Sequence, residues 1–222
     1  MTFIRNIFVK NNNLSEGKMK IIEKIKEKKI ISVVRIADKQ KCIDTVSALI
    51  DGGIEIIELT LENSCTYDVI NHFASKENSN VQIAAGGIIT TQQASLAYNA
   101  GAKLIISPVF QMSLVKFCKG LKVSHISTAT TPNEAYNAWK THIPLIKIYP
   151  TGHLGGVEYI QDILRPMPFL NIIATGAIKI DEISDYLATG VVGCAIGRDF
   201  YHNTTSFDEI TKRAKKAVSL IK

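Results

Sequence analysis

Short apolar runs rich in β-branched residues recur along the chain, and mixed segments of helical length separate them. The runs begin at Ile30, Ile54, Val81, Ala102, Leu121, Pro144, Asn171 and Val191. Neighbouring starts lie 19 to 27 residues apart, which is about the space that a strand, a helix and two short loops occupy. The pattern therefore predicts eight strands that alternate with helices.

The segments between the runs carry residues that start and stop helices. Asp38 is expected to cap a helix with Val46 and Leu49 on its buried face, and Gly52 and Gly53 are expected to end it. Three later segments carry similar start signals, namely the capping boxes Thr131 to Glu134 and Ser206 to Glu209, and Asp181 before a helix that ends near Gly190. The shortest connection, "VFQMSLVKFCKG", is expected to hold a helix as well.

Strands that alternate with helices in this way fit a (β/α)8 TIM barrel, and an open doubly wound sheet is the alternative. No glycine-rich dinucleotide fingerprint follows the first run. Residues 19–29 predict an additional N-terminal helix, with Ile21, Ile22 and Ile25 on the face that would close the bottom of a barrel. We expect one domain over residues 19–222 and a poorly ordered extension over residues 1–18.

Composition and charge narrow the classes of partner. No stretch approaches the roughly 18 apolar residues of a membrane span, so we expect a water-soluble protein with no membrane partner. Residues 1–30 hold eight Lys and Arg against three Glu, which accounts for +5 of the net charge of +6. No aromatic residues are interleaved with these lysines, which favours a solvated helix face over nucleic-acid binding. The four cysteines form no CxxC pair and have no His at metal-ligand spacing, so we expect reduced thiols, a cytoplasmic location and no metal.

Two charges stand inside otherwise apolar runs, near the C-terminal ends where active sites of this fold lie. Because side chains alternate along a strand, Glu58 shares a face with Ile56, and Lys147 shares one with Leu145. A buried amine loses stabilisation of its charged form and becomes a nucleophile toward carbonyls, and a nearby carboxyl can move the protons that imine formation requires. The alternative is a structural pair on a strand edge, but a closed barrel has no edge to protect.

The loops after the last two runs indicate a second site. "ATGAIK" and "AIGRDF" place small residues there, which lets backbone N–H groups approach an anion. Loops at these two positions form the usual phosphate site of a (β/α)8 barrel. The candidates are Thr175, Gly176, Ala177, Gly197 and Arg198. The alternative interpretation is that the glycines only serve tight turns.

A series of motifs runs in order through almost all of residues 19–222. They are "IISVVR", "GGIEIIELTL", "IISP", "TPNEA", "IKIYP", "GGVEYI" and "ATGAI". In them the chain resembles the 2-keto-3-deoxy-6-phosphogluconate / 4-hydroxy-2-oxoglutarate aldolase family of class I aldolases. The resemblance implies a (β/α)8 barrel that commonly assembles as a trimer and needs no metal or other cofactor.

The resemblance also implies roles for single residues by their position in the motifs. Lys147 in "KIYP" matches the family's Schiff-base lysine, and Glu58 in "IELTL" matches its general acid/base glutamate. Tyr149 stands where an aromatic residue follows that lysine, and Pro108 in "ISP" matches a pocket residue. Arg35 matches an arginine often seen at the end of the first strand.

The sequence departs from the family pattern around the substrate. Glu62 stands where members with "EVTLR" have an arginine that helps to hold the pyruvate carboxylate. Gly87 in "AAGG" replaces a substrate-contacting threonine of the family. The residues that we expect to bind the substrate are Arg35, Thr60, Gly87, Pro108 and Tyr149. Arg35 is a candidate to hold the carboxylate instead, and Arg198, in place of a small polar residue, would strengthen phosphate binding. A different acceptor or weak activity is equally consistent with these changes.

The leading hypothesis is an Entner-Doudoroff-type lyase of carbohydrate metabolism. It would cleave a 2-keto-3-deoxy (6-phospho) sugar acid or 4-hydroxy-2-oxoglutarate to pyruvate and an aldehyde, through a Schiff base on Lys147. Two alternatives stay open: a non-catalytic barrel that binds a sugar phosphate, and an isomerase or epimerase that uses Glu58 as base without an imine. The expected partner is a small keto acid, and the expected assembly is a homotrimer.

Overall fold

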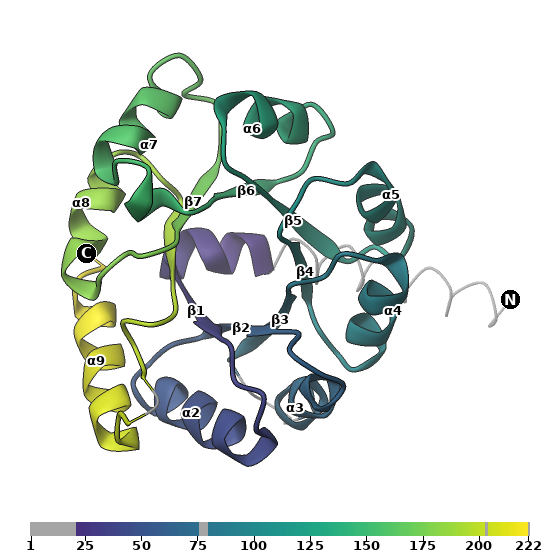
Figure 1. Cartoon of the computed structure of the whole chain (residues 1–222), viewed down its shortest axis with the longest axis vertical. Helices are drawn as coiled ribbons and strands as arrows, with labels where there is room; N and C mark the ends of the chain where they lie inside the picture. Colours follow the sequence, from purple (N-terminus) through teal and green to yellow (C-terminus); the bar gives the residue numbers. More distant parts are fainter. Residues whose placement is uncertain (1–20, 76–79, 203, 222) are drawn as a thin grey trace, which may run out of the picture.

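Eight parallel strands form a closed barrel in sequence order, with β1 paired to both β2 and β8 (Figure 1). The structure, a computed structural model, describes residues 21–75, 80–202 and 204–221. The strands are β1 (Ile30–Val34), β2 (Ile56–Thr60), β3 (Gln82–Gly86), β4 (Leu104–Ser107), β5 (Ser124–Ala129), β6 (Leu145–Ile148), β7 (Ile172–Thr175) and β8 (Gly193–Ile196). Each predicted run contains one of them, so the (β/α)8 barrel is confirmed and the open sheet is wrong.

Helices surround the barrel on its outside (Figure 1). They are α2 (Lys39–Asp51), α3 (Cys65–Ala74), α4 (Thr91–Asn99), α5 (Met112–Gly120), α6 (Pro132–Trp139), α7 (Val157–Leu164), α8 (Ile183–Ala188) and α9 (Phe207–Ser219), with 3-10 turns η1 (Thr151–His153) and η2 (Ile180–Glu182). The helix expected in the fourth connection is therefore present as α5. The extension that the sequence predicts to be poorly ordered, residues 1–18, lies outside the described residues.

Two apolar cores lie on the two sides of the barrel wall. The inner core contains Ile31, Ile56, Ala84, Leu104, Ile106, Ile126, Leu145, Ile173 and Ala195. The outer and larger core fills the space between the strands and the helices. Strand side chains alternate between the two, because successive residues of a strand point to opposite faces.

A helix over residues 21–28 closes the N-terminal end of the barrel and is drawn in purple in Figure 1. Its Ile21, Ile22 and Ile25 are buried and belong to the inner core. Lys24 and Lys28 each lie 2.8 Å from a carboxylate oxygen of Glu55, just before β2. The predicted additional helix is confirmed over these residues. Because this end is closed, a ligand can reach the interior only from the C-terminal ends of the strands.

Local signals set most helix starts as the sequence predicts. Asp38 caps α2, because its Oδ1 accepts the N–H of Lys41 at 2.7 Å. Thr131 and Glu134 form the predicted capping box of α6, with the side chain of each accepting a backbone N–H of the other's residue. Asp181 lies in η2, directly before α8.

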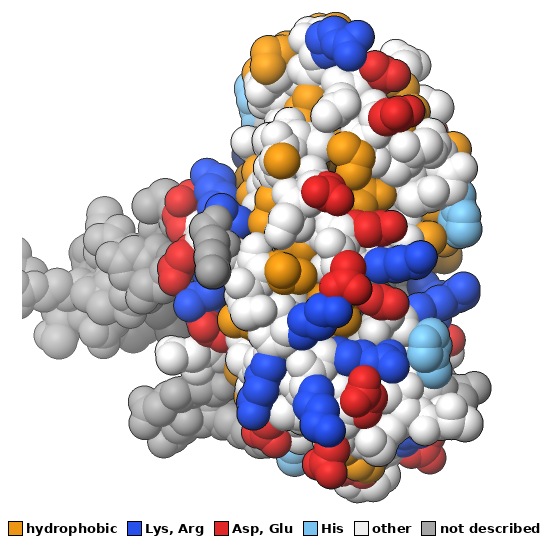
Figure 2. Space-filling view, turned by 90° about the vertical axis from the view of Figure 1, so that its left-hand side faces the viewer, with side chains coloured by type: hydrophobic (Ala, Val, Ile, Leu, Met, Phe, Trp, Pro, Cys, Tyr) orange, Lys and Arg blue, Asp and Glu red, His pale blue; other side chains and the backbone are white. Residues whose placement is uncertain are grey.

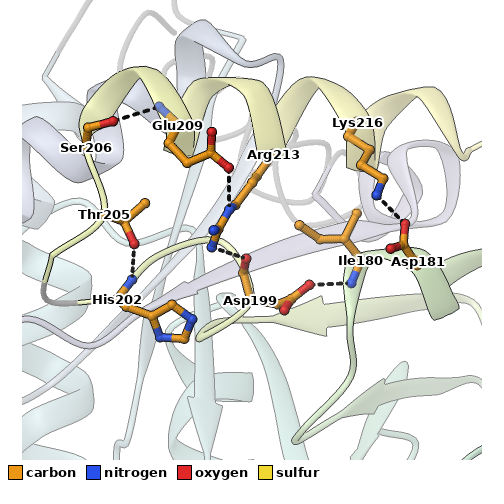
Figure 3. Close-up of polar contacts among 9 residues, drawn as sticks. All are labelled: Ile180, Asp181, Asp199, His202, Thr205, Ser206, Glu209, Arg213 and Lys216. Atoms are coloured by element: carbon orange, nitrogen blue, oxygen red, sulfur yellow. Dashed lines mark hydrogen bonds and ion pairs between the residues drawn. The ribbon is translucent and has the colours of Figure 1, made fainter.

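The capping box predicted for α9 is only half formed (Figure 3). Ser206 caps the helix, since its Oγ accepts the N–H of Glu209 at 3.3 Å. The carboxylate of Glu209 does not return to Ser206 but accepts from Nε of Arg213 at 3.0 Å. An ion pair one turn along the helix therefore competes successfully for this carboxylate.

The side of the molecule that carries α8 and α9 shows both signs of charge interleaved (Figure 2). Two of its ion pairs are Arg213 with Glu209 and Lys216 with Asp181, at 3.0 and 2.5 Å. This face therefore has no uninterrupted basic surface. Across the described residues, no helix combines the length and the hydrophobicity that crossing a membrane requires.

The four cysteines are free thiols, of which only Cys65 is exposed. Burial raises the pKa of Cys42 to about 11 and that of Cys194 to about 12. These two thiols therefore stay protonated at neutral pH and are poor nucleophiles.

Candidate functional site

The charged centre of the site lies inside the barrel. Lys147 on β6 and Glu58 on β2 are each 4% exposed, and the Lys147 ammonium Nζ donates to Glu58 Oε2. Leu145 and Ile56, which precede them by two residues on the same strands, belong to the inner apolar core. Strands β2 and β6 face each other across the ring, so closure brings together two charges that are 89 positions apart. A buried ion pair contributes little net stability because of desolvation, which favours a functional explanation.

Gly86, at the end of β3, leaves room for the carboxylate of Glu58. A Cβ atom at this position would lie 2.2 Å from Oε1 and 2.8 Å from Cγ of Glu58. Any side chain here would therefore displace the carboxylate from Lys147. The sequence did not predict this role; the available signal was a glycine at an inward-facing strand position, two residues after Ala84.

Thr60 ends β2 two residues beyond Glu58 and is 5% exposed. Its hydroxyl Oγ1 has no hydrogen-bond partner among the described residues, so a polar substrate group would satisfy it. Gly87 lies beside it, since a Cβ there would be 3.2 Å from Thr60 Cγ2. The φ of Gly87 is +71°, a conformation that favours glycine. The structure thus places these two expected substrate-binding residues next to each other.

Arg35 follows β1 and is exposed at the open end of the barrel. Its Nη1 lies 3.4 Å from Glu62 Oε1. Its backbone N–H donates to the hydroxyl of Tyr201 at 2.6 Å, and that hydroxyl donates to the carbonyl of Val33 at 3.2 Å. The guanidinium of Arg35 is therefore already paired with a carboxylate of the chain itself. Tyr201, which holds the Arg35 backbone, was not predicted from the sequence because it lies 166 positions away.

Tyr149 and Pro108 directly follow β6 and β4 at the same end and are both exposed. The ring of Tyr149 lies against Gly176, where a Cβ would be 2.8 Å from Tyr149 Cδ2. The ring therefore spans from the strand that carries Lys147 to the loop after β7. Both residues lie at the rim of the mouth.

Thr175 ends β7 and joins it to its neighbours. Its hydroxyl donates to the carbonyl of Ala195 on β8 at 2.8 Å. Its backbone N–H donates to Oγ1 of Thr151 at 3.3 Å, and Thr151 was not predicted from the sequence. Both donors of this expected phosphate-binding residue are thus engaged within the protein.

The other expected phosphate-binding residues lie in the loops after β7 and β8. Gly176 and Ala177 form the first loop, with φ values of +93° and +58°, and Gly197 and Arg198 form the start of the second. Among the described residues, no backbone carbonyl accepts the N–H of Ala177 or the N–H of Arg198. The side chain of Arg198 is exposed. Amide donors and a guanidinium in adjacent loops suit an anion.

A second buried polar pair lies on the outer side of the barrel wall. His125 on β5 is 5% exposed, and its Nε2 lies 3.1 Å from Oγ of Ser107 on β4. Ile126 belongs to the inner core, so the preceding His125 points outward. Burial lowers the pKa of His125 to about 4, and the ring is neutral at neutral pH. This pair is therefore separate from the mouth of the barrel.

In the parts of the chain that the structure describes, no three His, Cys, Asp or Glu side chains gather so that they could hold a metal ion. The groups that do gather are an amine and a carboxylate, with the Thr60 hydroxyl beyond them on the same strand. Such an amine can attack a carbonyl carbon to form an imine, and such a carboxylate can move the required protons.

The sequence matches the family described as "KDPG and KHG aldolase" over residues 21–217. A 2-dehydro-3-deoxy-phosphogluconate aldolase of Haemophilus influenzae is 28% identical over 214 residues, which are 94% of this chain and 100% of the relative. A KHG/KDPG aldolase of Escherichia coli is 28% identical over 193 residues, with coverages of 85% and 90%. A solved KDPG aldolase of Legionella pneumophila, with pyruvate captured as a covalent carbinolamine intermediate, has a TM-score of 0.77 at 21% identity, with coverages of 85% and 93%. The chain therefore belongs to the KDPG and KHG aldolase family.

Proposed function

We propose that this chain is a class I aldolase that cleaves 2-keto-3-deoxy-6-phosphogluconate, or 4-hydroxy-2-oxoglutarate, to pyruvate and an aldehyde. The observation that carries the proposal is the contact between Lys147 Nζ and Glu58 Oε2, inside a barrel that is open only at its C-terminal end. Membership of an aldolase family supports the same reaction class.

Lys147 is the nucleophile of the first step. Transfer of one proton from its ammonium to Glu58 turns the buried ion pair into a neutral amine and a neutral acid. The amine then attacks the C2 ketone of the substrate. Glu58 delivers the proton with which the carbinolamine hydroxyl leaves as water, and a protonated imine remains.

The protonated imine is the electron acceptor of the second step. Glu58, again a carboxylate, removes the proton of the C4 hydroxyl, and the C4 oxygen forms the aldehyde carbonyl. The electron pair of the C3–C4 bond moves into the new double bond of an enamine. Protonation at C3 and addition of water at C2 then release pyruvate and restore the amine of Lys147.

The other residues at the mouth hold the two ends of the substrate. In this proposal the Thr60 hydroxyl and Arg35 bind the carboxylate and the hydroxyls near C2, and the substrate competes with Glu62 for Arg35. Gly87, Pro108 and the ring of Tyr149 line the same opening. The phosphate binds at the other loops, to the amides of Ala177 and Arg198 and to the guanidinium of Arg198, and Gly176 and Gly197 leave room for it to approach the backbone.

We also infer a homotrimer that acts in the cytoplasm. Four free thiols suit a reducing compartment. Exposed apolar side chains, among them Val109, Met112 and Trp139, provide surface that an assembly can bury. Light scattering should give three chains per particle, and the mass of a single 24.4 kDa chain would contradict the trimer.

Borohydride trapping tests the mechanism, because borohydride reduces an imine to a stable secondary amine. After incubation with pyruvate, mass spectrometry should locate a reduced pyruvate adduct on the peptide that contains Lys147. The adduct should be absent in Lys147→Ala. A wild-type enzyme without an adduct, or a variant with an undiminished one, would contradict the proposal.

Turnover separates the proposal from its alternatives. Pyruvate release from 2-keto-3-deoxy acids, followed with a coupled dehydrogenase, would exclude a non-catalytic barrel. An isomerase or epimerase with Glu58 as base would instead exchange substrate protons with solvent in the presence of borohydride. For the aldolase, Glu58→Gln should lower pyruvate release by about 10²- to 10⁴-fold, the usual contribution of a general acid/base.

A further inference from the structure

A carboxylate outside the charged centre connects the two loops that follow β7 and β8 (Figure 3). Asp199 lies in the loop after β8, and its Oδ2 accepts the backbone N–H of Ile180 at 2.7 Å. Ile180 is the first residue of η2 and closes the loop after β7. One side chain thus joins two loops whose anchoring residues are 19 positions apart.

The backbone of Asp199 is itself held by a helix. Arg213 on α9 donates from Nη1 to the carbonyl of Asp199 at 3.2 Å, and its Nε donates to Glu209 at 3.0 Å (Figure 3). Helix α9 is fixed against α2, since Thr211 Oγ1 donates to the carbonyl of Ala48 at 2.9 Å. The bridge between the loops therefore rests on a packed part of the fold, not on a free segment.

A second link joins β7 to β8 at the base of the two loops. The hydroxyl of Thr175 donates to the carbonyl of Ala195, where β7 and β8 end. Ala177 and Arg198 lie between this link and the one from Asp199 to Ile180. The two links together hold both ends of each loop, so the gap between the loops has a set width.

We propose that Asp199 is a positioning residue for the phosphate end of the substrate: through Ile180 it sets the spacing of the two loops, and Arg213 holds it in place. The inference rests on the proposed function, in which amides and Arg198 in these loops bind phosphate. Asp199 does not touch the phosphate in this arrangement, because its carboxylate is engaged by the Ile180 N–H.

The length and the charge of the side chain can be separated by substitution. Asp199→Asn keeps an oxygen acceptor at the same reach without the charge, whereas Asp199→Glu keeps the charge on a longer arm. Asp199→Ala removes the acceptor. If spacing is what matters, the Asn variant behaves like the wild type, and the Glu and Ala variants behave alike.

The readout is KM for 2-keto-3-deoxygluconate with and without its 6-phosphate. In Asp199→Ala, KM for the phosphorylated acid should rise about 10-fold, as expected for loss of one hydrogen bond to a charged group, while kcat stays unchanged. KM for the unphosphorylated acid should not change. Asp181→Ala is the matched control, because it removes the ion pair of η2 with Lys216 on α9 and leaves the link between the loops intact.

Several results would overturn the inference. They are an unchanged KM for the phosphorylated acid in Asp199→Ala, equal rises for both acids, or the same effect in Asp181→Ala. If Asp199→Ala does not fold, the Asn and Glu variants still decide, since an Asn variant that binds the phosphorylated acid more tightly would indicate charge repulsion instead of spacing.

Failure of this inference can be distinguished from failure of the proposed function. Pyruvate carries no phosphate, so borohydride trapping on Lys147 reports the reactive amine independently of the two loops. A wild-type enzyme that traps pyruvate but has the same KM for both acids overturns the inference and leaves the aldolase mechanism in place.

Discussion

The two ends of the barrel interior differ in chemistry although the same strands build both. Near the N-terminal end, Ile56 and Leu145 pack in the inner core beneath the helix over residues 21–28. Two residues further along the same strands, Glu58 and Lys147 form a buried ion pair. Both pairs lie on the same two strands. They differ in what lies next to them, which is a helix at the N-terminal end of the barrel and loops at the C-terminal end.

The difference shows how this fold separates stability from reactivity. The helix over residues 21–28 seals the lower layer, which is the layer of Ile56 and Leu145. Apolar side chains there exclude water and stabilise the barrel by about 1.5–3 kcal/mol each. The upper layer is the layer of Glu58 and Lys147, and loops surround it. A substrate can therefore reach this layer, and the charged groups there can act on the substrate. Substitutions in the lower layer should change stability alone, and those in the upper layer should change activity first.

The largest effect is expected for Lys147→Met, which replaces the amine with an apolar chain of similar length. Loss of the nucleophile should lower kcat/KM by about 10⁴-fold or more. The variant should also lose about 3–5 kcal/mol of unfolding free energy, because Glu58 stays buried without its cation. Activity assays and urea unfolding measure the two effects.

The double variant Lys147→Met/Glu58→Gln is the control for this substitution. It should recover most of the lost unfolding free energy while it remains inactive, since no buried charge is left. A double variant as unstable as the single one would show that the ion pair itself holds the upper layer together.

In the lower layer, Leu145→Ala should act in the opposite way. Removal of buried methyl groups should cost about 2–5 kcal/mol of unfolding free energy. The kcat of the folded enzyme should stay unchanged, because the inner core does not touch the substrate. A strong fall in kcat at a temperature where the variant is folded would break the separation between the two layers.

The buried His125 on the outer side of the wall should make stability depend on pH. Its pKa of about 4 in the folded protein lies below the ordinary value of 6.5. The unfolded chain therefore binds a proton below about pH 6.5 that the folded protein refuses until about pH 4, so stability falls as pH falls through this window. The difference corresponds to about 3 kcal/mol at most. Urea unfolding at several pH values gives the unfolding free energy as a function of pH. Between about pH 4 and pH 6.5 this free energy should change less with pH in His125→Gln than in the wild type.

Gly86→Ala tests how closely the upper layer is fitted. The new Cβ would meet Oε1 of Glu58 at 2.2 Å, so the carboxylate must move away from Lys147. Misplacement of a catalytic group should lower kcat by about 10- to 100-fold. Gly120→Ala is the matched control, because a Cβ there meets nothing within 4 Å. Equal kcat in both variants would argue that Glu58 needs no fixed position.

The smallest effect is expected for Glu62→Gln at the rim. This substitution removes the carboxylate that lies beside Arg35, so KM for the keto acid should fall about two- to fivefold, as expected for an exposed ion pair. Glu23→Gln, which breaks the exposed pair with Lys26 in the helix at the closed end of the barrel, should leave KM as it is. A higher KM in Glu62→Gln would mean that Glu62 orients Arg35 and does not compete for it.

Local patterns predicted much of the fold. The eight strands, the cap at Asp38 and the capping box at Thr131 depend on a few neighbouring residues, and all of them formed. The box at Ser206 was predicted by the same rule but formed only in part, because Arg213 one turn away binds the Glu209 carboxylate. The spacing of Ser206 and Glu209 shows that a capping box is possible, but the structure decides whether the Glu209 carboxylate binds Ser206 or Arg213.

The sequence predicts the residues of the candidate site and the convergence of Glu58 and Lys147 near the mouth of a barrel, but not the other contacts that position them. Alternation along a strand placed Glu58 and Lys147 on inward faces, and the structure has them there. The sequence signal for Gly86, a glycine at an inward-facing strand position, does not reveal that Glu58 lies beside it. Tyr201, which supports Arg35 from the far end of the chain, has no local signal.

By itself, therefore, the sequence determined which residues form strands and helices and which strand residues face the interior, because both properties depend on periodicity over a few positions. Only the tertiary structure decided that Lys147 meets Glu58, that Glu62 meets Arg35 and that Asp199 bridges two loops. These contacts join segments that are distant along the chain. They depend on how the strands tilt and shift when the barrel closes, which no short stretch of sequence specifies.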